Sequence, residues 1–89
     1  MIKILKAEHS ERKVIRVLFS DHSWGEYDLQ PLIDRQTELV APLQDDDYFS
    51  QYFLELGALC WKNGLELSPR SIYEKLQEQG KLNTEPKAA

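Results

Sequence analysis

Few side chains in this sequence have the types and spacing that catalysis or metal binding requires. A serine or cysteine nucleophile needs a histidine to take its proton, but the 2 histidines, His9 and His22, fall in polar stretches and not beside Cys60. Asp21 and His22 are adjacent, yet no second histidine follows at a helical interval, and the aspartate run 45–47 lacks the spacing of a calcium loop. We therefore predict no catalytic residue and no metal site.

The remaining carboxylates, the glycines and the single cysteine have ordinary structural interpretations. Glu26, Asp28 and Asp34 are close in sequence, but nothing predicts a buried partner that would shift a carboxyl pKa, so solvated charges explain them better. The 4 glycines are isolated and form no phosphate-binding loop, so we predict no cofactor. Cys60 has no second cysteine to pair with, and the apolar run 58–61 predicts a small buried hydrophobe rather than a reactive thiol.

Two tryptophans are the residues for which a binding role competes best with core packing. Trp24 and Trp61 each adjoin turn residues, which would leave an indole partly exposed, and exposed tryptophan is enriched at binding hot spots. Core packing in a small domain is the alternative for both. The candidate partner-binding residues are therefore Trp24, Trp61, Tyr73, Asp21 and His22.

Length, composition and charge limit the class of protein. The 89 residues, 42% hydrophobic and 29% charged, suit one folded domain, which we place at 1–80, followed by a frayed tail at 81–89. A net charge of -4 with scattered basic residues argues against nucleic-acid binding. The start of the chain carries charges and no apolar stretch long enough for export or for a membrane, which favours the cytoplasm.

The N-terminal half has the pattern of antiparallel strands. Strands are predicted at 2–7, 13–19 and 24–29, separated by turns at 8–12 and 20–23. In the second strand, Ile15, Val17 and Phe19 share one face. Pro31 has no backbone N–H, so it ends the ladder and begins a short helical turn that leads into an irregular crossing.

The C-terminal half predicts a second hairpin between helical segments. Asp45 is placed to cap a brief helix that Phe49 would pin to the core. Two strands, at 52–56 and 58–61, fold over a tight turn at Gly57. The predicted fold class is α+β: a small, mostly antiparallel β-sheet of hairpins, one C-terminal amphipathic helix packed on it, and short helical turns in the middle.

The stretch WKNGLELSP, residues 61–69, predicts the joint between a strand and that helix. Asn63 and Gly64 supply the positive φ angles of a turn, and Ser68 is a good N-cap before Pro69, whose missing N–H would have no partner anyway. The helix continues with Ile72, Tyr73 and Leu76 at helical spacing, and Gly80 is placed to end it.

Segments between residues 14 and 73 resemble, in the same order, a bacterial family known as domain of unknown function 2442. They are VLFSD, GEYDLQPL, APLQDDDYF and LCWKNGLELSPRSIY, the last being similar to the family's strand, Trp, Asn-Gly, aliphatic-Asp-Pro and Tyr ending. The chain departs from the pattern in its longer turn at 21–25, where the family has Asp-Gly, and in Ser68, where the family has aspartate. Serine caps a helix as well as aspartate does.

This resemblance implies a small α+β domain with no established activity. Some members of the family look like partners of small neighbouring proteins of the toxin–antitoxin type, and others carry an added helix-turn-helix domain. No helical pair resembling that domain follows residue 80, so DNA binding is not expected.

Two classes of function fit the sequence. The first is a non-enzymatic protein-interaction module, with antitoxin-like neutralisation of a small neighbouring protein as its sharper form. The second is a small-molecule-binding protein or minor enzyme, with a pocket between the sheet and the 69–79 helix near Trp61 and Tyr73 and a polar group from the Asp21–His22 turn. The expected partner is a protein, either a neighbour or a second copy in a homo-oligomer.

Overall fold

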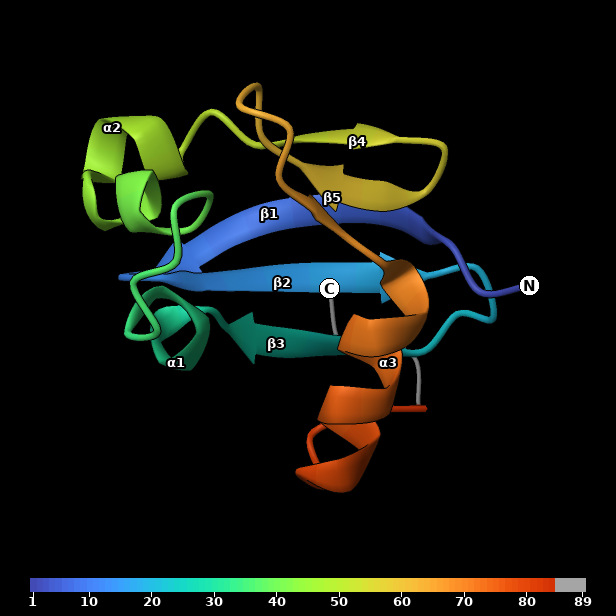
Figure 1. Ribbon diagram of the computed structural model, residues 1–89. Coiled ribbons are helices and arrows are strands. Elements are labelled where there is room, and N and C mark those ends of the chain that lie inside the picture. Colours follow the sequence, from blue (N-terminus) through green and yellow to red (C-terminus); the bar gives the residue numbers. More distant parts are fainter. Residues whose placement is uncertain (85–89) are drawn as a thin grey trace.

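The computed structural model describes residues 1–84, whose strands form two small antiparallel sheets of three strands each (Figure 1). The fold class predicted from sequence, α+β, is confirmed, although the strands are divided between two sheets. In chain order the elements are β1 (Ile4–Glu11), β2 (Val14–Phe19), β3 (Trp24–Asp28), α1 (Gln30–Ile33), the 3-10 helix η1 (Ala41–Gln44), α2 (Asp46–Phe49), β4 (Phe53–Glu55), β5 (Ala58–Cys60), β6 (Glu66–Leu67) and α3 (Pro69–Glu78).

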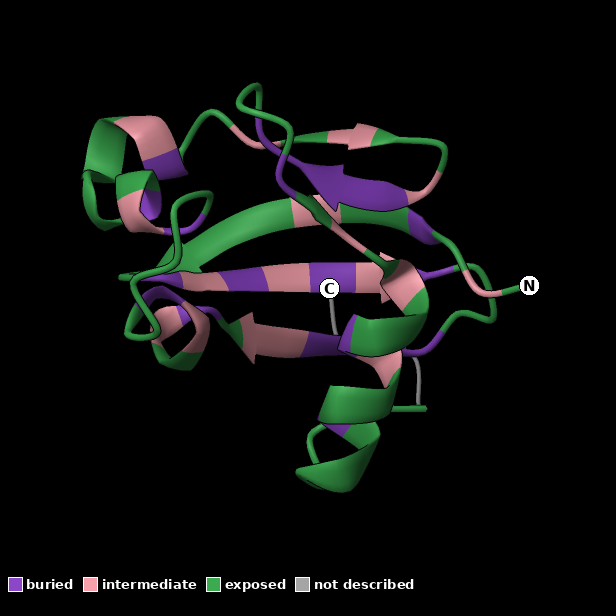
Figure 2. Cartoon of the chain, in the orientation of Figure 1, coloured by how far each residue is buried: buried purple, intermediate pink, exposed green. Residues whose placement is uncertain are grey.

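The first sheet has the order β1-β2-β3, and its central strand shows the predicted alternation. Ile15, Val17 and Phe19 are fully buried, while the residues between them are only partly buried (Figure 2). Side chains of successive strand residues point to opposite faces, so one face of this sheet is core and the other faces solvent.

The turn predicted at residues 8–12 is wrong, because β1 continues through this polar run. His9 pairs with Ile15 and Glu11 pairs with Val14, which leaves only Arg12 and Lys13 in the turn. Arg12 takes a φ of 44° there. A run of polar residues can continue a strand when the neighbouring strand supplies hydrogen-bond partners and one face of the sheet is exposed to solvent.

The second sheet has the order β4-β5-β6, and β4 and β5 form the hairpin expected at Gly57. Its two turn residues, Leu56 and Gly57, have φ angles of 52° and 83°, as in a type I′ turn. The Gly57 carbonyl accepts a 2.9 Å hydrogen bond from the Ile4 N–H, so the turn is held against the start of β1. A β-carbon on Gly57 would lie 2.6 Å from the Lys3 β-carbon.

The joint between β5 and α3 is built largely as predicted. The Gly64 N–H donates to the Trp61 carbonyl at 3.1 Å, and of the Asn63–Gly64 pair only Gly64 has a positive φ, 98°. Asn63 contributes its side-chain oxygen, which accepts from the Leu65 N–H at 3.1 Å. Ser68 caps α3 by accepting from the Ser71 N–H, so the helix begins where the cap directs it.

One hydrophobic core joins the two sheets, the short helices and α3. Trp61 is 1% exposed, and its indole Nε1–H donates to the Phe49 carbonyl at 3.0 Å. Phe49 is the residue that pins α2, whose N-cap Asp45 accepts from the Tyr48 N–H as expected. On the opposite side, Leu76 of α3 closes over β3, where a β-carbon on Gly25 would lie 2.9 Å from a Leu76 methyl.

Residues 81–84 follow α3 and lie beside β3. Asn83 and Trp24 exchange two backbone hydrogen bonds, of 2.9 and 2.8 Å, which form an isolated antiparallel bridge. The tail predicted at 81–89 therefore contains a residue, Asn83, that is hydrogen-bonded to the first sheet, while residues 85–89 lie outside the described part of the chain. Within residues 1–84, none of the helices has the length and apolar character needed to span a membrane.

Replacing Trp61 by alanine should lower the free energy of unfolding by about 3–5 kcal/mol, the usual cost of truncating a buried aromatic side chain. Urea unfolding followed by far-UV circular dichroism measures this. Trp24→Ala is the matched control and should cost clearly less, because Trp24 is only partly buried. Equal losses in the two variants would show that the core does not depend on Trp61 in particular.

Gly57→Ala and Gly64→Ala should separate steric overlap from backbone strain. Both positions have positive φ, so each alanine should cost about 1–2 kcal/mol of stability through strain. Gly64 has open space where the β-carbon would go, whereas at Gly57 that atom would overlap Lys3 and add about 1–3 kcal/mol. Urea unfolding midpoints that are equal for the two variants would contradict this close approach.

Candidate functional site

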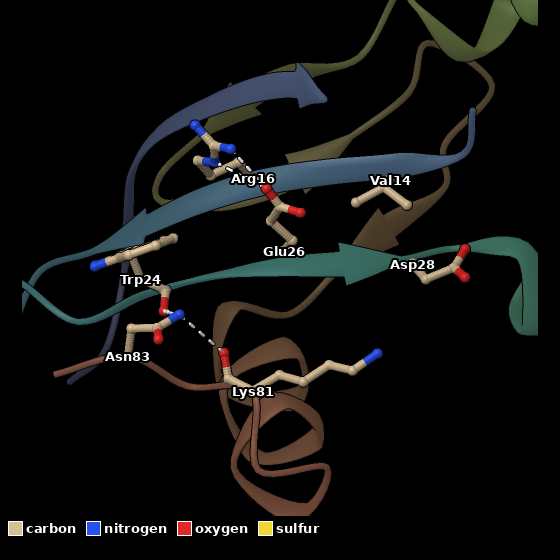
Figure 3. A pocket seen from close by; sticks show the side chains of 7 residues that line it. All are labelled: Val14, Arg16, Trp24, Glu26, Asp28, Lys81 and Asn83. Atoms are coloured by element: carbon tan, nitrogen blue, oxygen red, sulfur yellow. Dashed lines mark hydrogen bonds and ion pairs between the residues drawn. The ribbon is translucent and has the colours of Figure 1, made fainter. Parts of the chain in front are cut away.

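The solvent face of the first sheet carries a groove of about 470 Å³ (Figure 3). It lies over β2 and β3 and reaches the segment that follows α3. Its lining residues are Val14, Arg16, Trp24, Glu26, Asp28, Lys81 and Asn83.

Strand register places these side chains together. Arg16 pairs with Glu26 and Leu18 pairs with Trp24 across β2 and β3, so all of them lie on the face opposite the core. The Arg16 guanidinium donates to a Glu26 carboxylate oxygen at 2.6 and 3.2 Å. Its central carbon lies 5.9 Å from the centre of the Trp24 ring, within reach of a cation–π contact.

Trp24 is held from two sides, which gives it a fixed place in the groove. Its backbone is bonded to Asn83, and its ring packs near the Arg16 guanidinium. Because the Arg16 and Glu26 side chains remain 35% and 40% exposed, their ion pair orients the guanidinium more than it stabilises the fold. The result is a half-buried indole with charges of both signs around it.

This arrangement is suited to contact with a polar molecular surface. Groups that bind small molecules usually converge in an enclosed, mostly apolar cavity, whereas this groove is open and rimmed by the charges of Arg16, Lys81, Glu26 and Asp28. In the part of the chain that the structure describes, no three His, Cys, Asp or Glu side chains come together as metal ligands would.

A second polar cluster brings together two of the residues singled out from sequence. The Tyr73 hydroxyl donates to an Asp21 carboxylate oxygen at 2.8 Å, and the other oxygen accepts from the hydroxyl and the N–H of Ser23. The Tyr73 ring packs edge-to-face on Phe19, with centroids 5.0 Å apart. This cluster fastens α3 to the turn between β2 and β3.

The hydrogen bonds of this cluster shift two pKa values. The Ser23 hydroxyl donates to the ionised carboxylate and lowers the pKa of Asp21, assisted by the Ser23 N–H and Tyr73. The same bond to Asp21 raises the pKa of Tyr73, because the protonated hydroxyl is the donor. Both shifts favour the protonation states that hold the cluster together near neutral pH, which are an ionised Asp21 carboxylate and a neutral Tyr73 hydroxyl.

The candidates His22 and Trp61 make no hydrogen bond to the Asp21–Tyr73 pair among those found in the described residues. His22 is exposed in the same turn as Asp21, with a φ of 73°, and its N–H donates to the Phe19 carbonyl at 2.9 Å. Trp61 is in the core of the second sheet and lines a different hollow from Tyr73. The structure thus unites Asp21 and Tyr73, places His22 beside them, and leaves Trp24 and Trp61 at separate positions.

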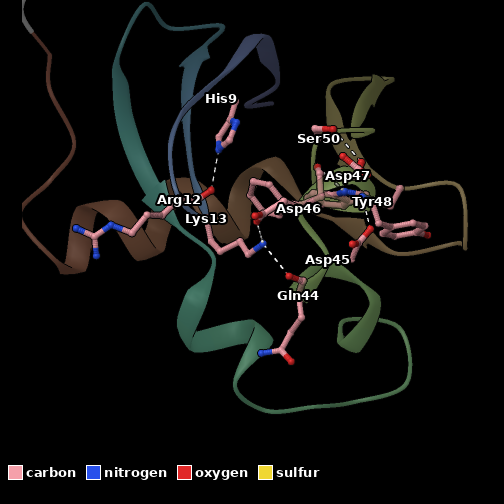
Figure 4. A network of polar contacts seen from close by, with 11 residues as sticks. His9, Arg12, Lys13, Gln44, Asp45, Asp46, Asp47, Tyr48 and Ser50 are labelled. Carbon is pink, nitrogen blue, oxygen red and sulfur yellow. Dashed lines mark hydrogen bonds and ion pairs between the residues drawn. The ribbon is translucent and has the colours of Figure 1, made fainter.

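Lys13 is a buried cation that sequence analysis did not single out (Figure 4). It is 9% exposed, and its Nζ donates to the Gln44 carbonyl at 3.0 Å and to Asp46 at 2.6 Å, 5.0 Å from the centre of the Phe49 ring. The hydrogen bond from Lys13 lowers the pKa of Asp46. His9 Nε2 donates to the Arg12 carbonyl at 2.7 Å. These contacts dock the β1–β2 turn on α2, and this structural role explains why Lys13 is buried.

Cys60 is buried, as predicted, and has the properties of an unreactive thiol. Burial raises its pKa, and the nearby carboxylates Glu66 and Glu55 raise it further, which disfavours the nucleophilic thiolate.

Sequence reasoning missed Arg16 and Asn83, two residues that line the groove. The strand pattern places Arg16 and Trp24 on solvent faces, but only the register between β2 and β3 shows that they meet. Asn83 is followed by residues with little to bury, and no local signal connects it to Trp24.

Comparison with known families gives one match. A family model described as "Protein of unknown function (DUF2442)" matches residues 4–78, from the first strand to the end of α3. The chain belongs to the DUF2442 family. The resemblance noted over residues 14–73 is therefore confirmed, and the description of the family assigns no activity. No curated protein and no solved structure matches this DUF2442 chain.

The Asp21 cluster of this DUF2442 protein should make stability depend on pH in acid. Because the folded pKa of Asp21 lies below its usual 3.8, ionised Asp21 stabilises the fold above that pH, and this contribution is lost as the pH falls through the folded pKa. Urea midpoints of the parent and of Asp21→Asn should differ most above about pH 5, and the difference should shrink as the pH falls below the usual pKa of aspartate and through the lowered folded pKa of Asp21. The difference should be modest because Asp21 is exposed to solvent.

The matched control for this pH series is Asp47→Asn, on an exposed carboxylate in the first turn of α2. Asp47 lies outside the Asp21 cluster, so a pH-dependent gap that is specific to Asp21→Asn is assigned to that cluster. A gap between the parent and Asp21→Asn that stays constant from neutral pH to about pH 3 would contradict the role given to the ionised carboxylate.

Proposed function

We propose that this DUF2442 protein is a non-enzymatic protein-interaction module that binds its partner through the Trp24 groove. The observation that supports this most directly is the half-buried Trp24 indole, held between the Arg16 guanidinium and the backbone bridge to Asn83. A large aromatic side chain that is already ordered loses little conformational entropy on binding, and such residues contribute strongly at interfaces.

The charges around Trp24 bear on which partners would fit. Arg16 and Glu26 already pair with each other, whereas Asp28 and Lys81 stand at the exposed rim of the groove. Rim charges of both signs select a complementary surface and steer its approach more than they add affinity. The net charge of -4 favours a basic partner at long range. Antitoxin-like neutralisation of a small basic neighbouring protein is the sharper form of this proposal.

The alternative, a small-molecule site near Trp61 and Tyr73, has less support. The indole of Trp61 is buried and its N–H is already bonded to Phe49, so it presents no free face to a ligand. The hollow beside Tyr73, about 320 Å³, is formed with Met1, Ile2 and the exposed side of α3.

Trp24→Ala should weaken binding of the native partner by at least about 30-fold, the loss typical of a hot-spot residue. The partner is first recovered by affinity purification from the cells that make this protein and identified by mass spectrometry. Its dissociation constant is then measured by calorimetry with the parent and with the variant. Arg16→Ala should also weaken binding, since it removes the group that orients the indole.

Leu39→Ala is the control for these variants, because it removes an exposed apolar side chain (43% exposed) outside the groove. Circular dichroism confirms that each variant is folded. A partner that binds Trp24→Ala and Arg16→Ala as tightly as it binds the parent would show that the groove is not its docking site.

A further inference from the structure

The outer edge of β3, on the side away from β2, is open over part of its length. The N–H and C=O of Trp24 point to this edge, because both are bonded to Asn83. Peptide groups along an antiparallel strand point alternately to its two sides, and the register between β2 and β3 is regular. The peptide groups of Glu26 and Asp28 therefore point to the same edge, and within residues 1–84 they make no backbone hydrogen bond there.

Two hollows lie on either side of this open edge. On the solvent face, the Trp24 groove is lined by Glu26 and Asp28 (Figure 3). Tyr27 lies between them in β3 and points to the opposite face, where it lines a second hollow of about 200 Å³ between α1 and α3. We call this second hollow the Tyr27 hollow; its other lining residues are Pro31, Leu32, Arg35, Lys75 and Gln79. An extended segment laid along the edge would send successive side chains alternately toward the groove and toward the Tyr27 hollow.

The Tyr27 hollow offers hydrogen-bond donors to an anionic group. Arg35 and Lys75 are exposed, and neither forms an ion pair with a residue in the part of the chain that the structure describes. Tyr27 adds a hydroxyl that stays protonated, because burial raises its pKa. No carboxylate of residues 1–84 lines this hollow, although the chain as a whole has a net charge of -4. A carboxylate side chain from outside accepts its strongest hydrogen bonds from charged donors such as these two cations.

We propose that β3 accepts an extended segment of the protein partner as an additional strand, and that an aspartate or glutamate of this segment enters the Tyr27 hollow. This inference rests on the proposed function and specifies how the partner binds. Main-chain hydrogen bonds to Glu26 and Asp28 supply affinity, and the side chains that enter the groove and the Tyr27 hollow supply specificity. The added strand is short, because Asn83 already occupies the edge beside Trp24.

Two features distinguish this edge from the open edges that are common in small sheets. It has a hollow on each side, and one of them holds two cations that form no ion pair within residues 1–84. Arg35 and Lys75 act at short range on one side chain of the partner, whereas the net charge of -4 acts on the partner as a whole. A basic partner with one acidic residue in the docked segment satisfies both conditions.

The test uses linear peptides selected on the purified full chain from a random library displayed on phage. The selected peptides should share an aspartate or glutamate. When such a peptide is bound, amide hydrogen exchange followed by NMR should slow by at least about 10-fold at Glu26 and Asp28. The amides of Gly25 and Tyr27 are internal controls, because they already face β2 and should change less. Methylation of the peptide's backbone nitrogens, one at a time, should weaken binding at alternate positions, since every second N–H faces β3.

Substitutions in the Tyr27 hollow test the charge preference. Arg35→Ala and Lys75→Ala should each weaken binding of the acidic peptide about 5-fold or more, measured by calorimetry. Lys62→Ala removes an exposed cation elsewhere and is the matched control, which should leave the affinity unchanged. A peptide whose acidic residue is replaced by glutamine should bind the parent and Arg35→Ala with similar affinity, because the interaction that distinguishes them is gone. Unchanged urea midpoints show that the three variants are folded.

A library that yields no binder would overturn the proposal, and so would a bound peptide that leaves the Glu26 and Asp28 amides unprotected. Selected peptides whose affinity is the same for the parent, Arg35→Ala and Lys75→Ala would overturn it as well.

Trp24→Ala separates this inference from the proposed function. If peptides lose affinity for Trp24→Ala but do not protect the β3 edge, the groove is the docking site and strand addition is wrong. If they protect the edge and bind Trp24→Ala as tightly as the parent, strand addition holds and the role given to the Trp24 indole is wrong.

Discussion

The burial of Trp61 and its hydrogen bond to the Phe49 carbonyl connect the parts of this fold. Trp61 directly follows β5, and Phe49 ends α2, so this one contact joins the second sheet to the crossing that arrives from the first. Phe49 in turn lies under the ammonium group of Lys13, in the β1–β2 turn. The sheets share few backbone hydrogen bonds, and side-chain packing through these residues keeps them together. The solvent face that carries Trp24 depends on that packing for its shape.

Local chemistry explains which parts of the fold could be predicted from the sequence. The alternation of Ile15, Val17 and Phe19, the cap at Ser68 and the positive φ at Gly57 follow from short-range rules that the sequence displays directly. Polar residues obscured the end of β1, because their strand conformation is imposed by pairing with β2. The division into two sheets depends equally on pairing between distant residues, which no single segment encodes.

The candidate site shows the same limit more sharply. Trp24 and Trp61 both stand next to turn residues, yet one is half-exposed and the other is buried. Strand register and long-range packing decide this difference. Tyr73 and Asp21 are 52 positions apart in the sequence, and no local pattern around either residue predicts their hydrogen bond. Sequence alone could therefore name Trp24, Asp21 and Tyr73 as candidates but could not assign them to a groove and to a clasp on α3.

The order in which the strands occur along the chain has a consequence for synthesis on the ribosome. The β1–β2 hairpin is made first, and its row of Ile15, Val17 and Phe19 has nothing to cover it at that stage. The cover comes from residues made much later, including Trp61 and Leu76. A nascent chain therefore carries part of this apolar strand exposed until the later segments that complete the core have left the exit tunnel. During this interval the chain exposes the apolar surface that a chaperone or another unfolded chain can bind.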